Sequence, residues 1–320
     1  MIDGCGREID HLRLSLTDHC NLACRYCVPG RDRHVYHMID PNFALRLVEW
    51  LTLKHGIRHV RLTGGEPLLH PHIVQLVARL SKLRLLHELT LTTNGQALAA
   101  KAAALHAAGL DRINVSLDTL DPHRFEWITR GGQLALTLGG IETAIHEGLT
   151  PLKINVVVQR GVNDGGICEL AEWGLRRGCI VRFLEVMPIG PFQHVVDQHL
   201  VPAAEIVQRL AERFDLRSIP APPGQPAVDF TVTGDGVRGV IGVIAPTTQP
   251  FCRRCRRLRV TSRGDVIPCV HDRNSANLNT AWDGVELNEP LADEILEAVI
   301  GRKAPIGPMN QAVSLVRIGG

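Results

Sequence analysis

Short runs rich in β-branched residues alternate with amphipathic stretches between about residue 12 and residue 190. The runs predict strands at residues 12–16, 59–63, 88–93, 112–117, 153–158 and 181–186. The stretches predict helices at residues 43–55, 73–83, 98–108, 134–146 and 167–177, three of which end at a glycine. Repeated strand–helix units form a parallel sheet covered by helices, and eight of them close a full barrel. The six units here predict an α/β fold with a partial, open barrel.

The strand–helix rhythm weakens after Gly190. A further helix is expected at 203–214, and a proline-rich stretch at 220–226 indicates a linker. A hairpin is expected around Gly234–Gly236. We therefore expect two units, a barrel over residues 1–218 and a C-terminal module over residues 219–320.

Composition places the chain among ordinary folded proteins, with 45% hydrophobic and 21% charged residues in 320. A net charge of +2 gives no reason to expect bulk nucleic-acid binding. No apolar run approaches the roughly 20 residues of a membrane helix, and the first residues do not form a secretory signal. We expect a cytoplasmic protein without a membrane partner, whose nine cysteines are ligands or free thiols rather than disulfides.

Three cysteines follow the first predicted strand in the spacing C-x3-C-x2-C: Cys20, Cys24 and Cys27. They therefore lie at the strand end where barrel enzymes carry their active sites. Closely spaced thiolates select an iron–sulfur cluster or zinc. A cubane cluster takes four cysteines, so three would leave one iron open for chemistry. A zinc site completed by His19 or by a distant residue is the alternative.

A second set of cysteines, Cys252, Cys255 and Cys269, again supplies three thiolates. A structural zinc site with His271 as its fourth ligand is the alternative, since zinc sites use such short spacings. Arginine is dense beside this set. On a predicted strand Arg257 and Arg259 share one face, where they suit phosphate oxygens, and the residue between them faces the other way.

The sequence resembles the radical S-adenosylmethionine (SAM) superfamily in the first cysteine set, with its aromatic Tyr26, and in the segment Arg61–Pro67. Further segments narrow the resemblance to the GTP 3′,8-cyclase family of molybdenum cofactor biosynthesis: 6–8, 12–18, 92–95, 114–118, 181–188 and 251–259. It runs from about Gly6 to the terminal Gly319–Gly320, which matches the double-glycine tail of the family.

The resemblance implies a partial (βα)6 TIM-like barrel of the radical SAM type with a C-terminal Fe–S module. It implies two [4Fe–4S] clusters, held by Cys20, Cys24 and Cys27 and by Cys252, Cys255 and Cys269, with the first set catalytic. It implies contacts with SAM from Tyr26, Gly65, Ser116 and Met187. It implies contacts with GTP from Arg13, Arg61, Thr92, Lys153, Arg257, Leu258 and Arg259. Arg182 is a further candidate for the substrate.

The implied reaction converts GTP to 3′,8-cyclo-7,8-dihydro-GTP through a 5′-deoxyadenosyl radical. The implied partners are a cyclic pyranopterin monophosphate synthase, which takes the product, and an unidentified reductant; a homodimer is left open. His59, Arg256, His271 and the stretch 41–45 depart from the family pattern. They keep open a radical SAM paralogue that acts on another nucleotide or a peptide. A non-enzymatic electron carrier or a zinc-stabilised interaction protein is the remaining alternative.

Overall fold

The fold is described here from a computed structural model, which covers residues 1–28, 36–220, 224–272 and 275–303. Six parallel strands form the barrel wall: β1 (His11–Ser15), β2 (His59–Thr63), β3 (Glu88–Thr93), β4 (Arg112–Ser116), β5 (Lys153–Val158) and β6 (Ile180–Glu185). Each lies within one residue of the strand expected from the sequence pattern. The partial barrel of six strand–helix units is therefore confirmed.

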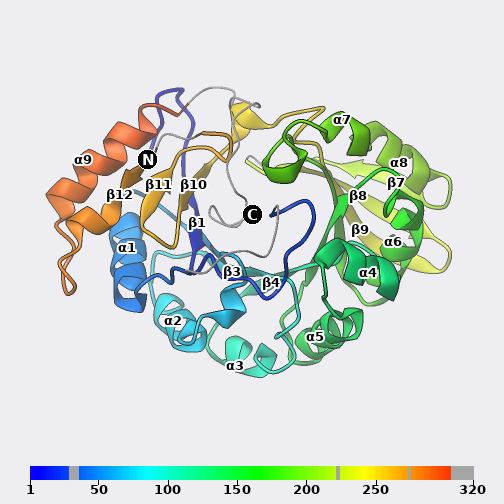
Figure 1. The fold of residues 1–320 in the computed structure, drawn as a ribbon, viewed down its shortest axis with the longest axis horizontal. Coiled ribbons are helices and arrows are strands. Elements are labelled where there is room, and N and C mark those ends of the chain that lie inside the picture. The colour runs from blue at the N-terminus through cyan, green and yellow to red at the C-terminus, as the bar shows by residue number, and fades with distance from the viewer. Residues whose placement is uncertain (29–35, 221–223, 273–274, 304–320) are drawn as a thin grey trace.

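Helices cover the outside of the curved sheet (Figure 1). The α-helices are α1 (Pro41–Lys54), α2 (Ile73–Leu80), α3 (Ala102–Ala107), α4 (Pro122–Thr129), α5 (Leu134–His146), α6 (Ile167–Arg176), α7 (Val196–His199), α8 (Ala203–Ala211) and α9 (Glu289–Ile300). Short 3-10 helices lie at Pro67–Leu69, Asp164–Gly166, Gly190–Phe192, Cys252–Arg254 and Leu278–Ala281. Side-chain caps begin several helices; Asp40, for instance, accepts from the backbone amides of Asn42 and Phe43 at the start of α1.

The C-terminal strands continue the barrel sheet at both of its edges. They are β7 (Asp215–Ile219), β8 (Ala227–Gly234), β9 (Val237–Ile244), β10 (Arg257–Val260), β11 (Asp265–Ile267) and β12 (Ala276–Asn277). The order across the sheet is β12-β11-β10-β1-β2-β3-β4-β5-β6-β9-β8-β7. The hairpin expected at Gly234–Gly236 is formed by β8 and β9.

The expected division at residue 218 falls within β7, which pairs with β8 on the far side of the division. Strand β9 pairs parallel with β6, and β10 pairs parallel with β1. Hydrogen bonds of the sheet therefore run without interruption from the barrel into the C-terminal strands. The division into two units stays a proposal, and residues 221–223 of the expected linker lie outside the described residues.

Strand alternation separates the apolar shell from a polar interior. In β1, Leu12 and Leu14 are fully buried against the helices, whereas His11 and Arg13 face the inside of the barrel. The same alternation holds in β2, where Val60 and Leu62 are buried beside Arg61. The core thus lies between sheet and helices, and the barrel interior is left for polar chemistry. None of the described helices is long and apolar enough to cross a membrane.

Candidate active site inside the barrel

The first cysteine loop follows β1 at the carboxyl end of the barrel strands. The glycine segment after β2 lies against it: the Gly65 amide donates to the Thr17 carbonyl at 2.6 Å and the Glu66 amide to the His19 carbonyl at 2.8 Å. A Cβ on Gly65 would lie 2.2 Å from the His19 carbonyl oxygen. Glycine at this position therefore permits a close approach of two backbone segments, one of which leads directly into Cys20.

The carboxylate of Glu66 fastens this segment to the next strand. It accepts from the Thr93 hydroxyl at 2.6 Å, the Asn94 amide at 2.7 Å and the Leu68 amide at 3.1 Å. Burial raises the pKa of Glu66 to about 7, against the lowering effect of these hydrogen bonds. No role for Glu66 was expected from the sequence. A carboxyl group directly after a Gly-Gly turn at a strand end was the only signal for it.

The three thiols of the first loop interact with one another in a buried setting. Burial raises the pKa of Cys20 to about 11 and raises that of Cys24 well above its ordinary value. The charges of Cys27 and Cys20 add to the effect on Cys24. The Leu22 amide donates to Cys20 Sγ at 3.4 Å and Asn94 Nδ2 does so at 3.7 Å. The donors aimed at Cys20 sulfur are those that a thiolate ligand needs.

The residues that resemblance links to SAM surround this loop. The Tyr26 hydroxyl donates to Asp118 Oδ2 at 2.9 Å. Asp118 lies two residues beyond Ser116, which is the last residue of β4. Met187, just beyond β6, packs with Ile189 in a small apolar cluster that Cys27 also contacts. The strand directions thus place these residues at the carboxyl end of the barrel, the end that carries the first three thiols.

The second cysteine set lies at the opposite end of the barrel. Strand β10 runs parallel to β1, so Cys252 and Cys255, which precede it, lie at its amino end. Strand β11 runs antiparallel to β10 and returns Cys269 to that same end. Burial is the largest cause that raises the pKa of Cys269, and the negative charges of Cys255 and Cys252 raise it further. The three thiols therefore lie close enough to interact.

A row of arginines crosses the barrel interior between the two cysteine sets. Register places Arg259 of β10, Arg13 of β1 and Arg61 of β2 side by side. Burial lowers the pKa of Arg61 to about 9 and that of Arg259 to about 10, with further lowering by neighbouring arginines. The pKa of Arg13 falls well below its usual range for the same two reasons. Like charges concentrated away from water call for an anion between them.

A second row lies closer to the carboxyl end of the barrel, where Thr92, Asn114 and Lys153 are aligned across β3, β4 and β5. Burial, followed by repulsion from Arg182 and Arg112, lowers the pKa of Lys153 to about 7. Asn114 is buried, and its Oδ1 has no hydrogen-bond partner among the described residues. The sequence analysis gave it no role of its own, although it stands two residues before Ser116 on the inward face of β4.

Two further basic residues of the interior have carboxylate partners. Arg112 pairs with Glu88 at 2.6 Å, and Arg182 lies 3.7 Å from Asp229. Arg182 is therefore placed as the sequence suggested, but with a carboxylate beside it. Arg112 was missed, although alternation from Asn114 along β4 points it inward.

Strand β10 confirms the alternation expected beside the second cysteine set. Leu258 is fully buried, whereas Arg257 and Arg259 lie on the inward face, with the Arg257 guanidinium 5.0 Å from the centre of the Phe251 ring. Arg253 and Arg254 are exposed.

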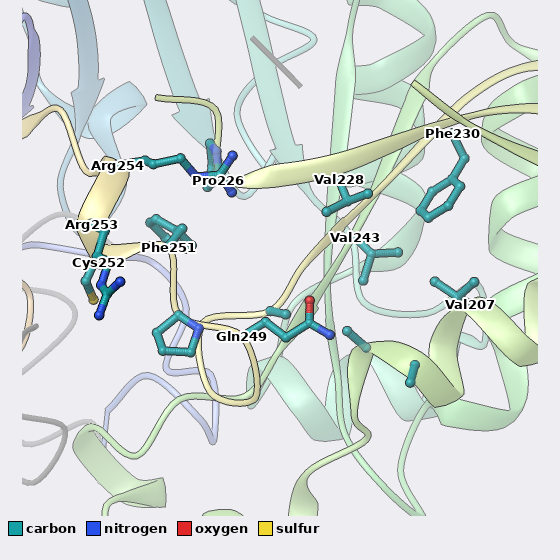
Figure 2. A pocket seen from close by; sticks show the side chains of 14 residues that line it. Val207, Pro226, Val228, Phe230, Val243, Gln249, Phe251, Cys252, Arg253 and Arg254 are labelled. Atoms are coloured by element: carbon teal, nitrogen blue, oxygen red, sulfur yellow. The ribbon is translucent and has the colours of Figure 1, made fainter. Parts of the chain in front are cut away.

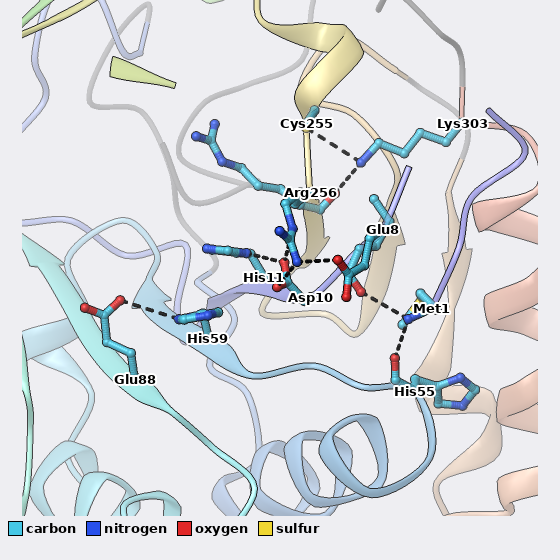
Figure 3. A network of polar contacts seen from close by, with 12 residues as sticks. Met1, Glu8, Asp10, His11, His55, His59, Glu88, Cys255, Arg256 and Lys303 are labelled. Atoms are coloured by element: carbon cyan, nitrogen blue, oxygen red, sulfur yellow. Dashed lines mark hydrogen bonds and ion pairs between the residues drawn. The ribbon is translucent and has the colours of Figure 1, made fainter. Parts of the chain in front are cut away.

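Three residues that depart from the family pattern, Arg256, His59 and His271, differ in the contacts that they make. Arg256 pairs with Asp10 and, at 2.6 Å, with Glu8 (Figure 3). The ring of His59 stacks on that of His11, with centroids 4.3 Å apart, at the amino end of the barrel. His271 is buried, and its Nδ1 lacks a hydrogen-bond partner within the described part of the chain.

The two cysteine sets fit iron–sulfur clusters by donor chemistry, since soft thiolates prefer such clusters. Among the described residues no three His, Cys, Asp or Glu side chains converge as ligands of one ion. A cubane does not need such convergence, because each of its cysteines binds a different iron. The terminal pair Gly319–Gly320 lies outside the described residues.

A pocket of about 870 Å³ is lined by α8, by the hairpin of β8 and β9 and by the segment that precedes β10 (Figure 2). Its walls are mostly apolar, as at Val228 and Val243, and it ends at Cys252 and Arg254. It shares no lining residue with the arginine row, although Cys252 of the second cysteine set lines it.

An open barrel with three thiols on the loop after β1 and a glycine segment after β2 defines a radical SAM protein. The family model described as the radical SAM superfamily matches residues 14–174, and that described as Molybdenum Cofactor Synthesis C matches residues 179–307. In solved structures, the fold is similar to that of Streptococcus suis SuiB bound to S-adenosylmethionine, with a TM-score of 0.62, 15% identity and coverage of 89% of this chain and 68% of that one.

Relatives that match nearly the full length of the chain identify the family within the radical SAM proteins. The chain is 39% identical to the GTP 3′,8-cyclase of Moorella thermoacetica over 96% of this chain and 94% of that one. It is 38% identical to the GTP 3′,8-cyclase of Geobacter sulfurreducens over 100% and 99%, and 41% identical to that of Acidothermus cellulolyticus over 90% and 84%. The chain belongs to the GTP 3′,8-cyclase family.

Proposed function

We propose that this chain converts GTP to 3′,8-cyclo-7,8-dihydro-GTP, the radical SAM step that begins molybdenum cofactor biosynthesis. The observation that carries the proposal is the row of Arg259, Arg13 and Arg61, which lie side by side between two sets of three thiols at opposite ends of one barrel. Arg259 is buried, and Arg13 and Arg61 are half-buried. A nucleoside triphosphate supplies the negative charge that this row lacks.

Cys20, Cys24 and Cys27 would hold one [4Fe–4S] cluster, and Cys252, Cys255 and Cys269 would hold the other. When bound, the first cluster and SAM supply one-electron chemistry that yields a 5′-deoxyadenosyl radical able to take the 3′ hydrogen of GTP. The protein contributes the positions of these groups. Its glycine segment, anchored by Glu66, fixes the first loop, and Tyr26 is fixed through Asp118.

SAM is held, in this proposal, by Gly65, Tyr26, Ser116 and Met187 around the first loop. Strand alternation supports Ser116, which ends β4 on the face that Asn114 shares. Met187 is half-buried and contacts the apolar cluster that includes Cys27, so its side chain lies beside the first set of thiols. These residues would exclude water from the reacting atoms, which protects a radical from side reactions.

The phosphates of GTP contact Arg13, Arg61, Arg257 and Arg259, with Thr92 and Lys153 on the facing wall. Leu258 stays in the proposed GTP site, although its side chain is buried on the face of β10 opposite the two arginines, where it fixes the strand that presents them. Arginine suits this role because its planar fork binds phosphate oxygens in pairs. The guanine base reaches the second cysteine set, whose three thiols leave an iron free to bind it. This places the 3′ carbon between the two ends of the barrel.

The partners and the cellular compartment are inferred from the chemistry of the reaction and of the cysteines. The product is passed to a cyclic pyranopterin monophosphate synthase, and a reductant delivers single electrons to the first cluster. None of the nine cysteines, all of which lie in the described ranges, forms a disulfide, which suits a reducing compartment such as the cytoplasm.

An anaerobic assay with SAM, dithionite and GTP tests the proposed function. We expect 5′-deoxyadenosine and a cyclised GTP product in equal amounts, and neither above background with ATP. Deoxyadenosine formed equally well with ATP would favour a paralogue with another substrate. Its absence with every nucleotide would refute the proposal.

A further inference from the structure

The side chain of Lys303 ends beside the second cysteine set. Its Nζ lies 3.7 Å from Cys255 Sγ and donates a short hydrogen bond to the Arg257 carbonyl oxygen (Figure 3). Only 3% of the residue is exposed. No sequence pattern points to Lys303, because 48 residues separate it from Cys255.

The N-terminal loop holds the backbone of Lys303 in place. Arg7 donates to the Lys303 carbonyl at 3.4 Å and to the Cys252 carbonyl at 2.8 Å, and the Cys5 thiol donates to the Lys303 carbonyl at 3.5 Å. Asp3 fixes Arg7 through an ion pair of 2.6 Å. The loop therefore joins one cysteine of the set to the lysine that contacts another.

The charge of Lys303 has a thiolate rather than a carboxylate as its partner. No salt bridge joins its amine to Asp or Glu in the described ranges. A buried cation at hydrogen-bond distance from a ligand sulfur stabilises extra negative charge on a cluster.

We propose that Lys303 is a positioning residue of the second cluster, which donates an N–H···S hydrogen bond to Cys255 and raises the reduction potential of that cluster. The inference rests on the proposed role of Cys252, Cys255 and Cys269 as cluster ligands. It goes beyond that role because it assigns a residue that tunes the cluster without ligating iron.

The test isolates the second cluster by replacing Cys20, Cys24 and Cys27 with serine, and it reconstitutes this background under anaerobic conditions. Lys303→Met removes the charge, Lys303→Arg keeps it, and Arg302→Met removes a charge from the exposed neighbouring residue. Each protein is analysed for iron and titrated with reductant, and the reduced cluster is followed by electron paramagnetic resonance.

We expect about four irons in each protein. At the potential that half-reduces the parent, the ratio of reduced to oxidised cluster should fall about tenfold in Lys303→Met, a shift of about 59 mV for one electron. Lys303→Arg and Arg302→Met should match the parent. If Lys303→Met fails to take up iron, Lys303→Gln, which keeps a hydrogen-bond donor without the charge, is titrated in its place.

Unchanged midpoints in proteins that hold their iron would overturn the inference and leave the proposed function standing. A parent background that binds no iron would overturn both, because the second set would then not be a cluster site.

Discussion

Replacing Gly65 with alanine should uncouple the first cysteine loop from the glycine segment. The new Cβ would lie 2.2 Å from the His19 carbonyl oxygen and 3.0 Å from the Cys20 amide nitrogen, where ordinary contact begins at 3.4 Å. The loop must therefore retreat by about 1.2 Å at the residue before Cys20, a proposed cluster ligand. Flexible side chains cannot absorb this shift, because both partners are backbone.

The cost of such overpacking is about 1–3 kcal/mol. We expect a melting temperature lower by several degrees, since 1 kcal/mol corresponds to roughly 2–4 °C in a domain of 150–250 residues. The effect on chemistry should be larger, because a displacement of about 1 Å at a reacting site can cost about 100-fold in rate. Production of 5′-deoxyadenosine from SAM in the anaerobic assay should fall by that factor or more.

The matched control is Gly139→Ala in helix α5, where an added Cβ meets nothing within 4 Å. Alanine is favoured over glycine in a helix by about 0.8–1.0 kcal/mol, so the control should melt at the same temperature or slightly higher and keep full activity. Normal iron content and normal SAM cleavage in Gly65→Ala would refute the reasoning.

Three further predictions follow from the charges and thiols of the barrel. Arg61→Met should raise the melting temperature of the GTP-free protein and weaken GTP binding about 10- to 100-fold, as expected for a charge-assisted hydrogen bond of about 1.5–3 kcal/mol. An unchanged affinity for GTP would show that Arg61 does not belong to the GTP site. Because the pKa of Lys153 is about 7 in the free protein, calorimetry in two buffers near pH 8 should detect proton uptake on GTP binding, and the affinity for GTP should fall as the pH rises through 7. Lys153→Met should abolish the proton uptake, and uptake that persists in this variant would assign it to another group. Cys24→Ser should abolish SAM cleavage, whereas Cys255→Ser should retain uncoupled cleavage and lose GTP turnover; the reverse pattern would exchange the roles of the two cysteine sets.

The same depression of the Lys153 pKa predicts how stability changes with pH. The unfolded lysine keeps its proton up to about pH 10.5, whereas the folded one releases it near pH 7. Between these values the unfolded state binds more protons, so this group makes the GTP-free protein more stable as the pH rises from 7 to 10.5. Bound GTP should weaken this dependence, because phosphate restores the proton on the lysine.

The sequence pattern predicted the barrel because its strands are short, β-branched and separated by amphipathic helices. It also predicted the inward face of β10, since alternation around Leu258 separates the two arginines from the core. Helix α3 was predicted too long: it begins at Ala102, and the residues before it form turns, one of which is tied by a 2.7 Å bond from Gln96 to Thr137.

Contacts between distant segments escaped the sequence analysis because no local period encodes them. The alignment of Thr92, Asn114 and Lys153 requires the register of three strands, and Glu66 gains its role only where Thr93 and Asn94 meet it. The continuation of the sheet from β6 into β9 and from β1 into β10 was likewise invisible, since the partners lie about 60 and 250 residues apart.

The most direct test of the account is isotope transfer from GTP to the adenosyl group. GTP that carries deuterium at C3′ is incubated with the reconstituted protein, SAM and dithionite without oxygen, and the 5′-deoxyadenosine is analysed by mass spectrometry. The account predicts one deuterium in each deoxyadenosine formed with GTP, and a product that has lost that deuterium. Deoxyadenosine without deuterium, formed at the same rate with and without GTP, would contradict the placement of GTP between the two ends of the barrel.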